Sequence, residues 1–202
     1  GTIIPVGESS LVPAVDGNDV TLTINSGLQW YAQNSLAARI RDTGAKSGTV
    51  VIMDAKNGNL LSVASYPTFD PNTDVGKKGA KLGNVAFSDV FEPGSTSKIM
   101  TIAAALEEGT VTPSTPVIIP NRLTRFDASF KDSHDHPTLY RTVAGTLAES
   151  SNIGTVLVSE TMTSKTLESY FRKFGLGQRS GTGYPGEAKG LLSPSETWSG
   201  TQ

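Results

Sequence analysis

The chain has 202 residues, of which 37% are hydrophobic and 18% charged, a composition typical of a folded globular protein rather than a disordered one. Its 17 Lys and Arg against 19 Asp and Glu give a formal net charge of −2, so no basic surplus favours nucleic acid. It has no cysteine, which excludes disulfides, cysteine-based zinc sites and a thiol nucleophile.

The chain begins with a connecting segment, a short strand and a helix. Residues 1–19 mix Gly, Pro, Ser and acidic residues, so we expect a linker there. Residues 20–24 alternate apolar and polar side chains, which predicts a strand. Asn25 is a suitable cap for a helix over residues 28–41, where apolar residues recur at helical spacing.

The clearest β pattern follows this helix. Residues 49–53 and 60–64 are apolar runs rich in β-branched residues, and Asn57-Gly58 lies between them. Two such runs around an Asn-Gly turn predict an antiparallel hairpin. Residues 66–90 carry Pro, Gly, Asn and Asp at intervals, which indicates a loop.

The second half of the chain is predicted to be mainly helical. A strongly apolar helix is expected over residues 95–108, after Pro93-Gly94, and residues 109–140 are rich in turn formers. Three more helices are expected at residues 142–149, 153–162 and 165–174. A hairpin followed by a run of helices predicts an α+β fold.

The run Ser95-Thr96-Ser97-Lys98 lies at the start of the apolar helix. Residues i and i+3 share a helix face, so the Ser95 hydroxyl and the Lys98 amine can meet there. Serine needs a base to become a nucleophile, and lysine becomes one when burial lowers its pKa. The backbone N–H groups of a helix N-terminus suit the oxyanion formed in acyl transfer. The alternative interpretation is a helix cap beside a solvated lysine.

A second polar run, Ser150-Ser151-Asn152, lies between two predicted helices. The Ser150 hydroxyl could pass a proton between Lys98 and a leaving amine. The Asn152 amide could bind a substrate carbonyl and hold Lys98. A plain helix cap explains the same residues and is compatible with these roles.

These two runs, in this order, resemble the active-site pair of penicillin-binding proteins and serine β-lactamases. The class B enzymes of cell division are the most similar branch. Residues 91–96 look like the family's approach to the nucleophile, and residues 54–72 resemble its first hairpin and the following loop. Further similar segments are residues 22–29, 174–177 and 184–187, although Asn25 stands where Asp is usual.

The resemblance implies a penicillin-binding, serine β-lactamase-like α+β fold with an antiparallel sheet packed between helices and a helical subdomain. It implies a peptidoglycan D,D-transpeptidase in which Lys98 deprotonates Ser95, Ser150 assists the leaving D-Ala, and Asn152 binds the substrate. Stem peptides and β-lactams would be its ligands, and division proteins its partners. We expect no cofactor, and a location on the outer face of the cytoplasmic membrane, with an anchor outside this chain.

The family's third motif, Lys-Thr-Gly or Lys-Ser-Gly, does not follow the other two here. Lys46-Ser47-Gly48 has the right letters but precedes Ser95 and opens the first hairpin strand. We therefore expect residues 20–202 to be the N-terminal part of a transpeptidase domain, completed by a C-terminal fragment. Without the third motif, this piece alone is expected to lose much of its activity.

Other functions stay open at this point. A β-lactamase or a β-lactam sensor shares the first two motifs, and a non-catalytic scaffold of the division machinery would keep the fold without the reaction. His134-Asp135-His136 could hold a metal, but these residues lie in a polar loop with no third ligand in view, so we expect no metal site.

Overall fold

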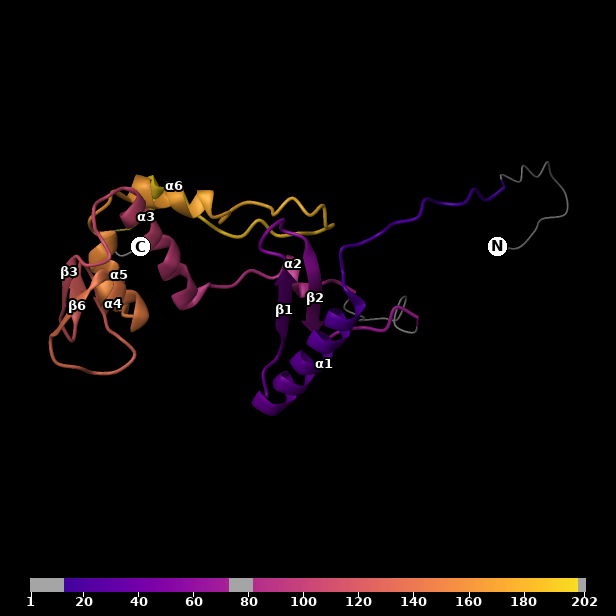
Figure 1. The fold of residues 1–202 in the computed structure, drawn as a ribbon, viewed down its shortest axis with the longest axis horizontal. Coiled ribbons are helices and arrows are strands. Elements are labelled where there is room, and N and C mark those ends of the chain that lie inside the picture. The colour runs from indigo at the N-terminus through magenta and orange to yellow at the C-terminus, as the bar shows by residue number, and fades with distance from the viewer. Residues whose placement is uncertain (1–12, 73–81, 200–202) are drawn as a thin grey trace. The chain divides into compact units, whose positions relative to one another are not determined.

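The computed structural model describes residues 13–72 and 82–199 (Figure 1). The chain divides into two compact units, Gly1–Leu82 and Gly83–Gln202, and each has its own hydrophobic core. In the described parts of both units, none of the helices is long and apolar enough to span a bilayer.

The first unit is a hairpin with a helix on one face. Helix α1 (Ser26–Thr43) precedes strands β1 (Gly48–Met53) and β2 (Leu60–Tyr66), which pair antiparallel. The small core joins helix and hairpin through Ala32, Leu36, Ile40 and Ala64. The predicted hairpin around Asn57-Gly58 is therefore confirmed.

Both ends of α1 follow from local sequence. The Asn25 side chain accepts a hydrogen bond from the Leu28 N–H, as its predicted capping role requires. Gly44, with φ of 66°, ends the helix in the left-handed conformation that glycine adopts readily. The strand predicted at residues 20–24 is wrong: this segment is irregular, and its Val20 and Leu22 side chains are exposed, so no apolar face drives pairing.

The second unit contains the remaining elements of the described residues, including the helices that the sequence predicts after residue 94. Four short strands form two antiparallel pairs, in a region that the sequence marks only as rich in turn formers. The helical elements are α2 (Val85–Ser88), η1 (Gly94–Ser97), α3 (Lys98–Glu107), α4 (Val143–Ala148), α5 (Asn152–Ser159), α6 (Ser164–Lys173) and η2 (Ser195–Thr197). The strands are β3 (Pro116–Ile119), β4 (Leu123–Arg125), β5 (Ala128–Phe130) and β6 (Leu139–Thr142).

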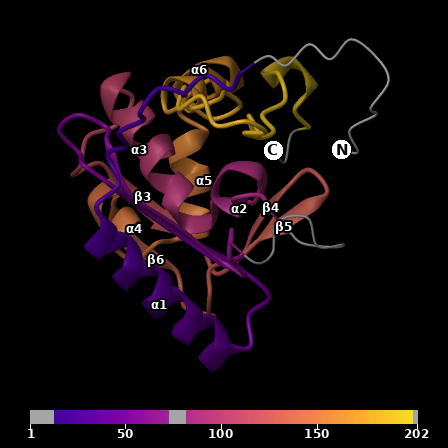
Figure 2. The ribbon, with the colours of Figure 1, turned by 90° about the vertical axis from the view of Figure 1, so that its right-hand side faces the viewer.

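Helices α3 and α5 pack against each other in the core of this unit, and Figures 1 and 2 both show them side by side. Ile102 of α3 and Ile153 and Val158 of α5 are almost fully buried in the same core. Burying large aliphatic side chains stabilises a fold by about 1.5–3 kcal/mol each. The N-termini of both helices are thus anchored from the apolar side, close to the polar runs singled out in the sequence.

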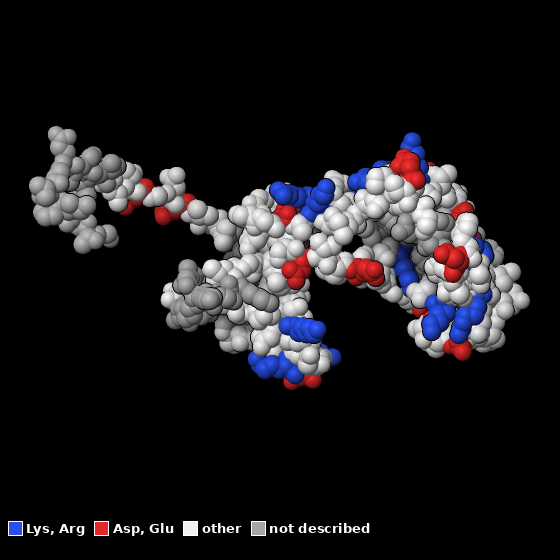
Figure 3. All heavy atoms as spheres, turned by 180° about the vertical axis from the view of Figure 1, so that it is seen from behind, with Lys and Arg blue, Asp and Glu red and all other residues white. Residues whose placement is uncertain are grey.

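The mixture of helices and antiparallel strands confirms the predicted α+β class. In the described residues the strands form three two-stranded sheets. On the face shown in Figure 3, basic and acidic side chains are interspersed in each unit.

Candidate active site

Ser95 lies in a tight turn just ahead of helix α3. The turn is the 3-10 helix η1, in which Gly94 has a φ of 60° and the Thr96 hydroxyl donates to the Pro93 carbonyl. The Ser97 hydroxyl donates to the Gly94 carbonyl over 2.7 Å. The Ser95 side chain itself is exposed. The α-helix expected from residue 95 therefore begins three residues later, and the turn before it presents Ser95 to solvent.

Lys98 is the first residue of α3 and is only 8% exposed. Its Nζ atom donates to the Ser150 carbonyl, and lies 3.1 Å from Ser150 Oγ and 2.6 Å from Asn152 Oδ1. Burial lowers the pKa of Lys98 below its ordinary value of 10.5, and the negative charge of Asp132 opposes this in part. The predicted burial of this lysine is confirmed, and its amine contacts Ser150 and Asn152 of the second motif.

The three partners of the Lys98 amine differ in what they can do with a proton. The Ser150 carbonyl and Asn152 Oδ1 can only accept hydrogen bonds, whereas the Ser150 hydroxyl can also donate one. An ammonium group satisfies all three as a donor. A neutral amine donates to the two carbonyl oxygens and accepts from the hydroxyl. The same geometry therefore suits both protonation states of Lys98, and only the Ser150 hydroxyl must rotate between them.

The turn that carries Ser150 joins α4 to α5. Ser150 has a φ of 56°, a left-handed conformation that is uncommon for residues with a side chain. Ser151 then caps α5, since its hydroxyl accepts from the Gly154 N–H over 2.8 Å. The capping role that the sequence assigned to Ser150 or Asn152 thus belongs to the residue between them, which frees both flanking side chains for Lys98.

The amide of Asn152 has a defined orientation. Its Nδ2 donates to the Lys131 carbonyl over 2.9 Å, and a carbonyl can only accept, so Oδ1 must face Lys98. The second N–H of this amide has no hydrogen-bond partner in residues 13–72 and 82–199. It remains available to a substrate carbonyl.

A cavity of about 920 Å³ joins the two motifs, and all of its lining residues belong to the second unit. Ser95, Lys98 and Asn152 line it, with Phe130 and Trp198 among its apolar walls. Within the described part of the chain, no hydrogen bond joins Ser95 Oγ to Lys98 Nζ, although both groups face this space. The serine and the amine share a groove, and their catalytic roles stay predictions.

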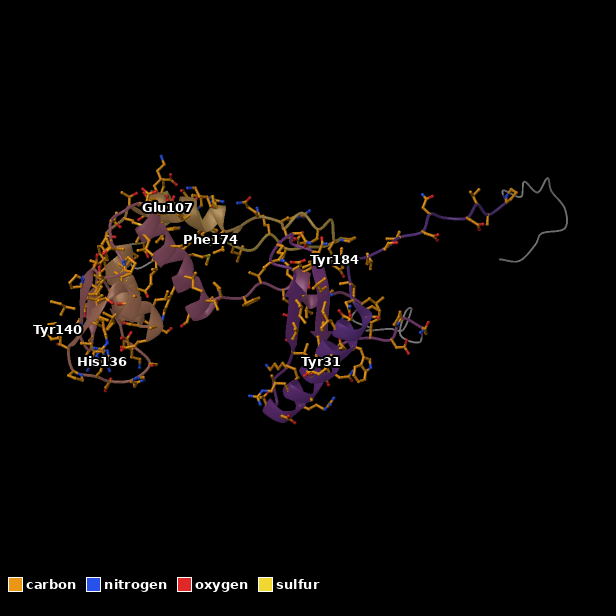
Figure 4. All side chains as sticks on the ribbon, in the orientation of Figure 1. Tyr31, Glu107, His136, Tyr140, Phe174 and Tyr184 are labelled. Carbon is orange, nitrogen blue, oxygen red and sulfur yellow. The ribbon has the colours of Figure 1, made fainter. Side chains whose placement is uncertain are left out.

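Sequence reasoning missed Asp132, which contacts the residues that follow Ser150 in the turn. Its carboxylate accepts from the Asn152 and Ile153 N–H groups and from the Ser151 hydroxyl. Nothing in the spacing of the chain pairs it with residues about twenty positions later. His136, labelled in Figure 4, lies four residues further in the loop before β6, with Nε2 at 3.1 Å from Asp132. In the described residues, no group of three or more His, Cys, Asp or Glu side chains is placed to hold a metal ion.

Comparison with known proteins shows which family the chain belongs to. The model of the penicillin-binding protein transpeptidase domain matches residues 48–202, which include both polar runs. The chain belongs to this family. The resemblance inferred from the sequence is confirmed, and so is the penicillin-binding, serine β-lactamase-like fold with its helical subdomain.

Relatives and solved structures support the assignment. The chain is 37% identical over 202 residues to the penicillin-binding protein PbpB of Mycobacterium tuberculosis, covering all of this chain and 30% of the relative. It is 32% identical over 183 residues to the peptidoglycan D,D-transpeptidase FtsI of Escherichia coli, covering 90% of this chain and 30% of that protein. The chain thus spans about a third of the length of these relatives.

Among solved structures, penicillin-binding protein 3 of Mycobacterium tuberculosis in complex with ampicillin matches with a TM-score of 0.88 and 37% identity. The match covers 96% of this chain and 43% of that one. At this identity and coverage, the fold described above is that of a penicillin-binding protein.

Proposed function

We propose that this chain carries the nucleophile and the proton-transfer residues of a peptidoglycan D,D-transpeptidase. Ser95 is the nucleophile, Lys98 the base, Ser150 the proton relay and Asn152 the substrate-binding amide. The observation that carries the proposal is the buried Lys98 amine, held by Ser150 and Asn152 at a cavity that Ser95 also lines. Family membership and relatives named as D,D-transpeptidases support it.

Acylation begins with the neutral amine of Lys98. It takes the proton of Ser95 Oγ while the oxygen forms a bond to the carbonyl carbon of the penultimate D-Ala of a donor stem peptide. The carbonyl π electrons move to oxygen, giving a tetrahedral oxyanion near the N–H groups of η1. When the oxyanion collapses, the C–N bond breaks. The leaving D-Ala amine takes a proton from Lys98 through the Ser150 hydroxyl.

Deacylation reverses these roles. The amine of an acceptor stem peptide attacks the ester carbonyl, the C–Oγ bond breaks, and Ser95 recovers a proton as the new peptide bond forms. A β-lactam would acylate the same serine by opening its ring. Its amine stays covalently attached in the product, so no leaving group makes room for the acceptor. The related penicillin-binding protein 3 with bound ampicillin or aztreonam supports β-lactams as ligands.

The proposed reaction also implies where in the cell the protein would act. Peptidoglycan stem peptides lie outside the cytoplasmic membrane, so we place the protein on its outer face, held by an anchor beyond this chain. Similarity to FtsI and PbpB supports a class B enzyme of cell division, with division proteins as partners. The strand that carries the third motif would come from the rest of the protein and complete the oxyanion hole.

Labelled penicillin tests the proposal on the full-length protein. A fluorescent penicillin should attach covalently to the wild type, with the adduct mapped to Ser95 by peptide mass spectrometry, and should not attach to Ser95→Ala. Ser88→Ala is a matched control, because Ser88 is an exposed serine of the same unit and its side chain hydrogen-bonds only to Asp89 among the described residues. Equal labelling of Ser95→Ala and the wild type would refute the proposed nucleophile. Rapid loss of the adduct would favour a β-lactamase instead.

A further inference from the structure

Asp132 is a buried carboxylate in the loop between β5 and β6, and its side chain is 10% exposed. One of its oxygens, Oδ1, accepts from the N–H of Asn152 over 2.5 Å and from that of Ile153 over 3.1 Å. The other, Oδ2, accepts from the Ser151 hydroxyl over 2.8 Å and lies 3.1 Å from His136 Nε2. A buried carboxylate is stable only when such contacts replace its water, and here all of them come from two short segments.

The contacts of Asp132 fall on the residues that carry the second motif. The first N–H groups of a helix lack partners within the helix, and a negative charge there is favourable. Asp132 and the Ser151 hydroxyl together satisfy three of these groups at the start of α5. The neighbouring Lys131 carbonyl also accepts from the Asn152 amide. Residues 131–132 thus hold Asn152 by both its backbone and its side chain.

The opposite side of the same turn faces Lys98. The Ser150 carbonyl, the Ser150 hydroxyl and Asn152 Oδ1 all reach its amine. Asp132 does not itself line the cavity, and in the described residues no hydrogen bond joins it to Lys98; it contacts the lining only through the backbone N–H of Asn152. It acts on the reaction only through the turn and through its charge.

We propose that Asp132 is a positioning residue of the acyl-transfer reaction, whose ionised carboxylate fixes the Ser150–Asn152 turn against the Lys98 amine. This inference rests on the proposed function, because it concerns how the same site is held together. Positioning of this kind has a large effect on rate, since a displacement of 1 Å at a catalytic group can cost about 10²-fold.

The charges around Asp132 support an ionised carboxylate. Burial alone would raise the pKa of Asp132, but its hydrogen bonds outweigh burial and lower the pKa below the ordinary 3.8. His136 contacts the Asp132 carboxylate from the same loop, and the negative charge of Asp132 raises the pKa of Lys98 in α3. Elsewhere in this loop, Asp135 pairs with Arg122 over 2.6 Å, and Lys131 contributes a further positive charge near Asp135.

His136 makes a further contact with the Asp132 carboxylate. Its Nδ1 lies 2.7 Å from the Pro137 carbonyl and its Nε2 3.1 Å from Asp132 Oδ2. The Pro137 carbonyl and the ionised Asp132 carboxylate can each accept a hydrogen bond from a ring nitrogen that carries a proton. The ring thus contacts the same carboxylate oxygen, Oδ2, that accepts from the Ser151 hydroxyl.

The test compares substitutions of Asp132 with one of Asp135 in the full-length protein. Asp132→Ala should lower the second-order rate of Ser95 acylation by labelled penicillin about 10²-fold per folded molecule. Asp132→Asn keeps the shape and removes the charge. Because that charge raises the pKa of Lys98, its loss should move the rising limb of the pH–rate profile to lower pH. Asp135→Asn, whose side chain is 75% exposed, should leave rate and profile unchanged.

The pH profile separates this proposal from a purely structural role. A substitution that only destabilised the fold would lower the amount of active protein equally at all pH values, which circular dichroism and the labelled fraction would reveal. An Asp132→Asn enzyme with the wild-type rate and profile would overturn the inference. Wild-type protein that is never labelled at Ser95 would instead refute the proposed function.

Discussion

A substitution at Gly154 tests how closely α5 packs against Thr146 and Ile119. A Cβ at this position would lie 2.5 Å from Thr146 Cγ2, 2.9 Å from Thr146 Oγ1 and 3.0 Å from Ile119 Cδ1. Both Thr146 and Ile119 are fully buried, so neither can move into solvent. We predict that Gly154→Ala destabilises the protein, although alanine is the better helix former.

The magnitude follows from two opposing effects. Alanine in place of a helical glycine contributes about 1 kcal/mol of stability, whereas overpacking a core costs about 1–3 kcal/mol. A separation of 2.5 Å is far inside normal contact, so the upper part of that range applies and the net loss is about 2 kcal/mol. In a Thr146→Ala background the two nearest atoms are gone, and the next neighbour is the terminal methyl Cδ1 of Ile119 at 3.0 Å. There Gly154→Ala should be neutral, or stabilising by up to about 1 kcal/mol.

The assay is a double-mutant cycle of thermal and urea unfolding. In a domain of this size, each kcal/mol moves the Tm by about 2–4 °C. Gly145→Ala in α4 is the control, because its Cβ would meet no atom closer than 3.5 Å and should give a small gain. An equal cost of Gly154→Ala with and without the Thr146 side chain would refute this account of the packing.

Two further predictions concern ionisable groups. Burial lowers the pKa of Lys98 below 10.5, so its neutral form increases as pH rises through that lowered value. Stopped-flow acylation of Ser95 should therefore become faster with rising pH and level off below pH 10.5, and a rate that begins to rise only above pH 10.5 would argue against a buried lysine base. Hydrogen bonds from Ser195 lower the pKa of Glu168 to about 2, so this contact is at full strength above the ordinary carboxyl pKa of 4.5 and is lost as pH falls through about 2. Glu168→Ala should therefore speed hydrogen exchange around Ser195 at neutral pH, as mass spectrometry would detect, and unchanged exchange there would contradict this role.

The sequence predicted the elements whose apolar pattern is long enough to repeat. The hairpin around Asn57-Gly58 and the three helices after residue 142 all formed, because several consecutive turns or alternations agree in each. Strands β3 to β6 were missed, since each has only three or four residues, too few for an alternating pattern to repeat. Their pairing depends on neighbours distant in the chain, which local patterns do not contain.

The sequence likewise predicted some residues of the candidate site and missed others. Ser95, Lys98, Ser150 and Asn152 were found because their letters and order resemble a family, and the structure brings Lys98 to the last two. Asp132 had no such signal, since its contacts with the second motif exist only after the β5–β6 loop folds back on α5. The sequence predicted a helix cap in this run, but only the hydrogen bond from the Gly154 N–H to the Ser151 hydroxyl shows that Ser151 provides it.

The left-handed backbone at Ser150 has a consequence for mutational tolerance. Glycine would suit that conformation best but would remove the hydroxyl that contacts Lys98. Threonine would keep a hydroxyl, but its branched side chain is a poor fit for a positive φ. Serine therefore meets both demands better than glycine or threonine, so a saturation library at this position that is screened for penicillin labelling should return mainly serine.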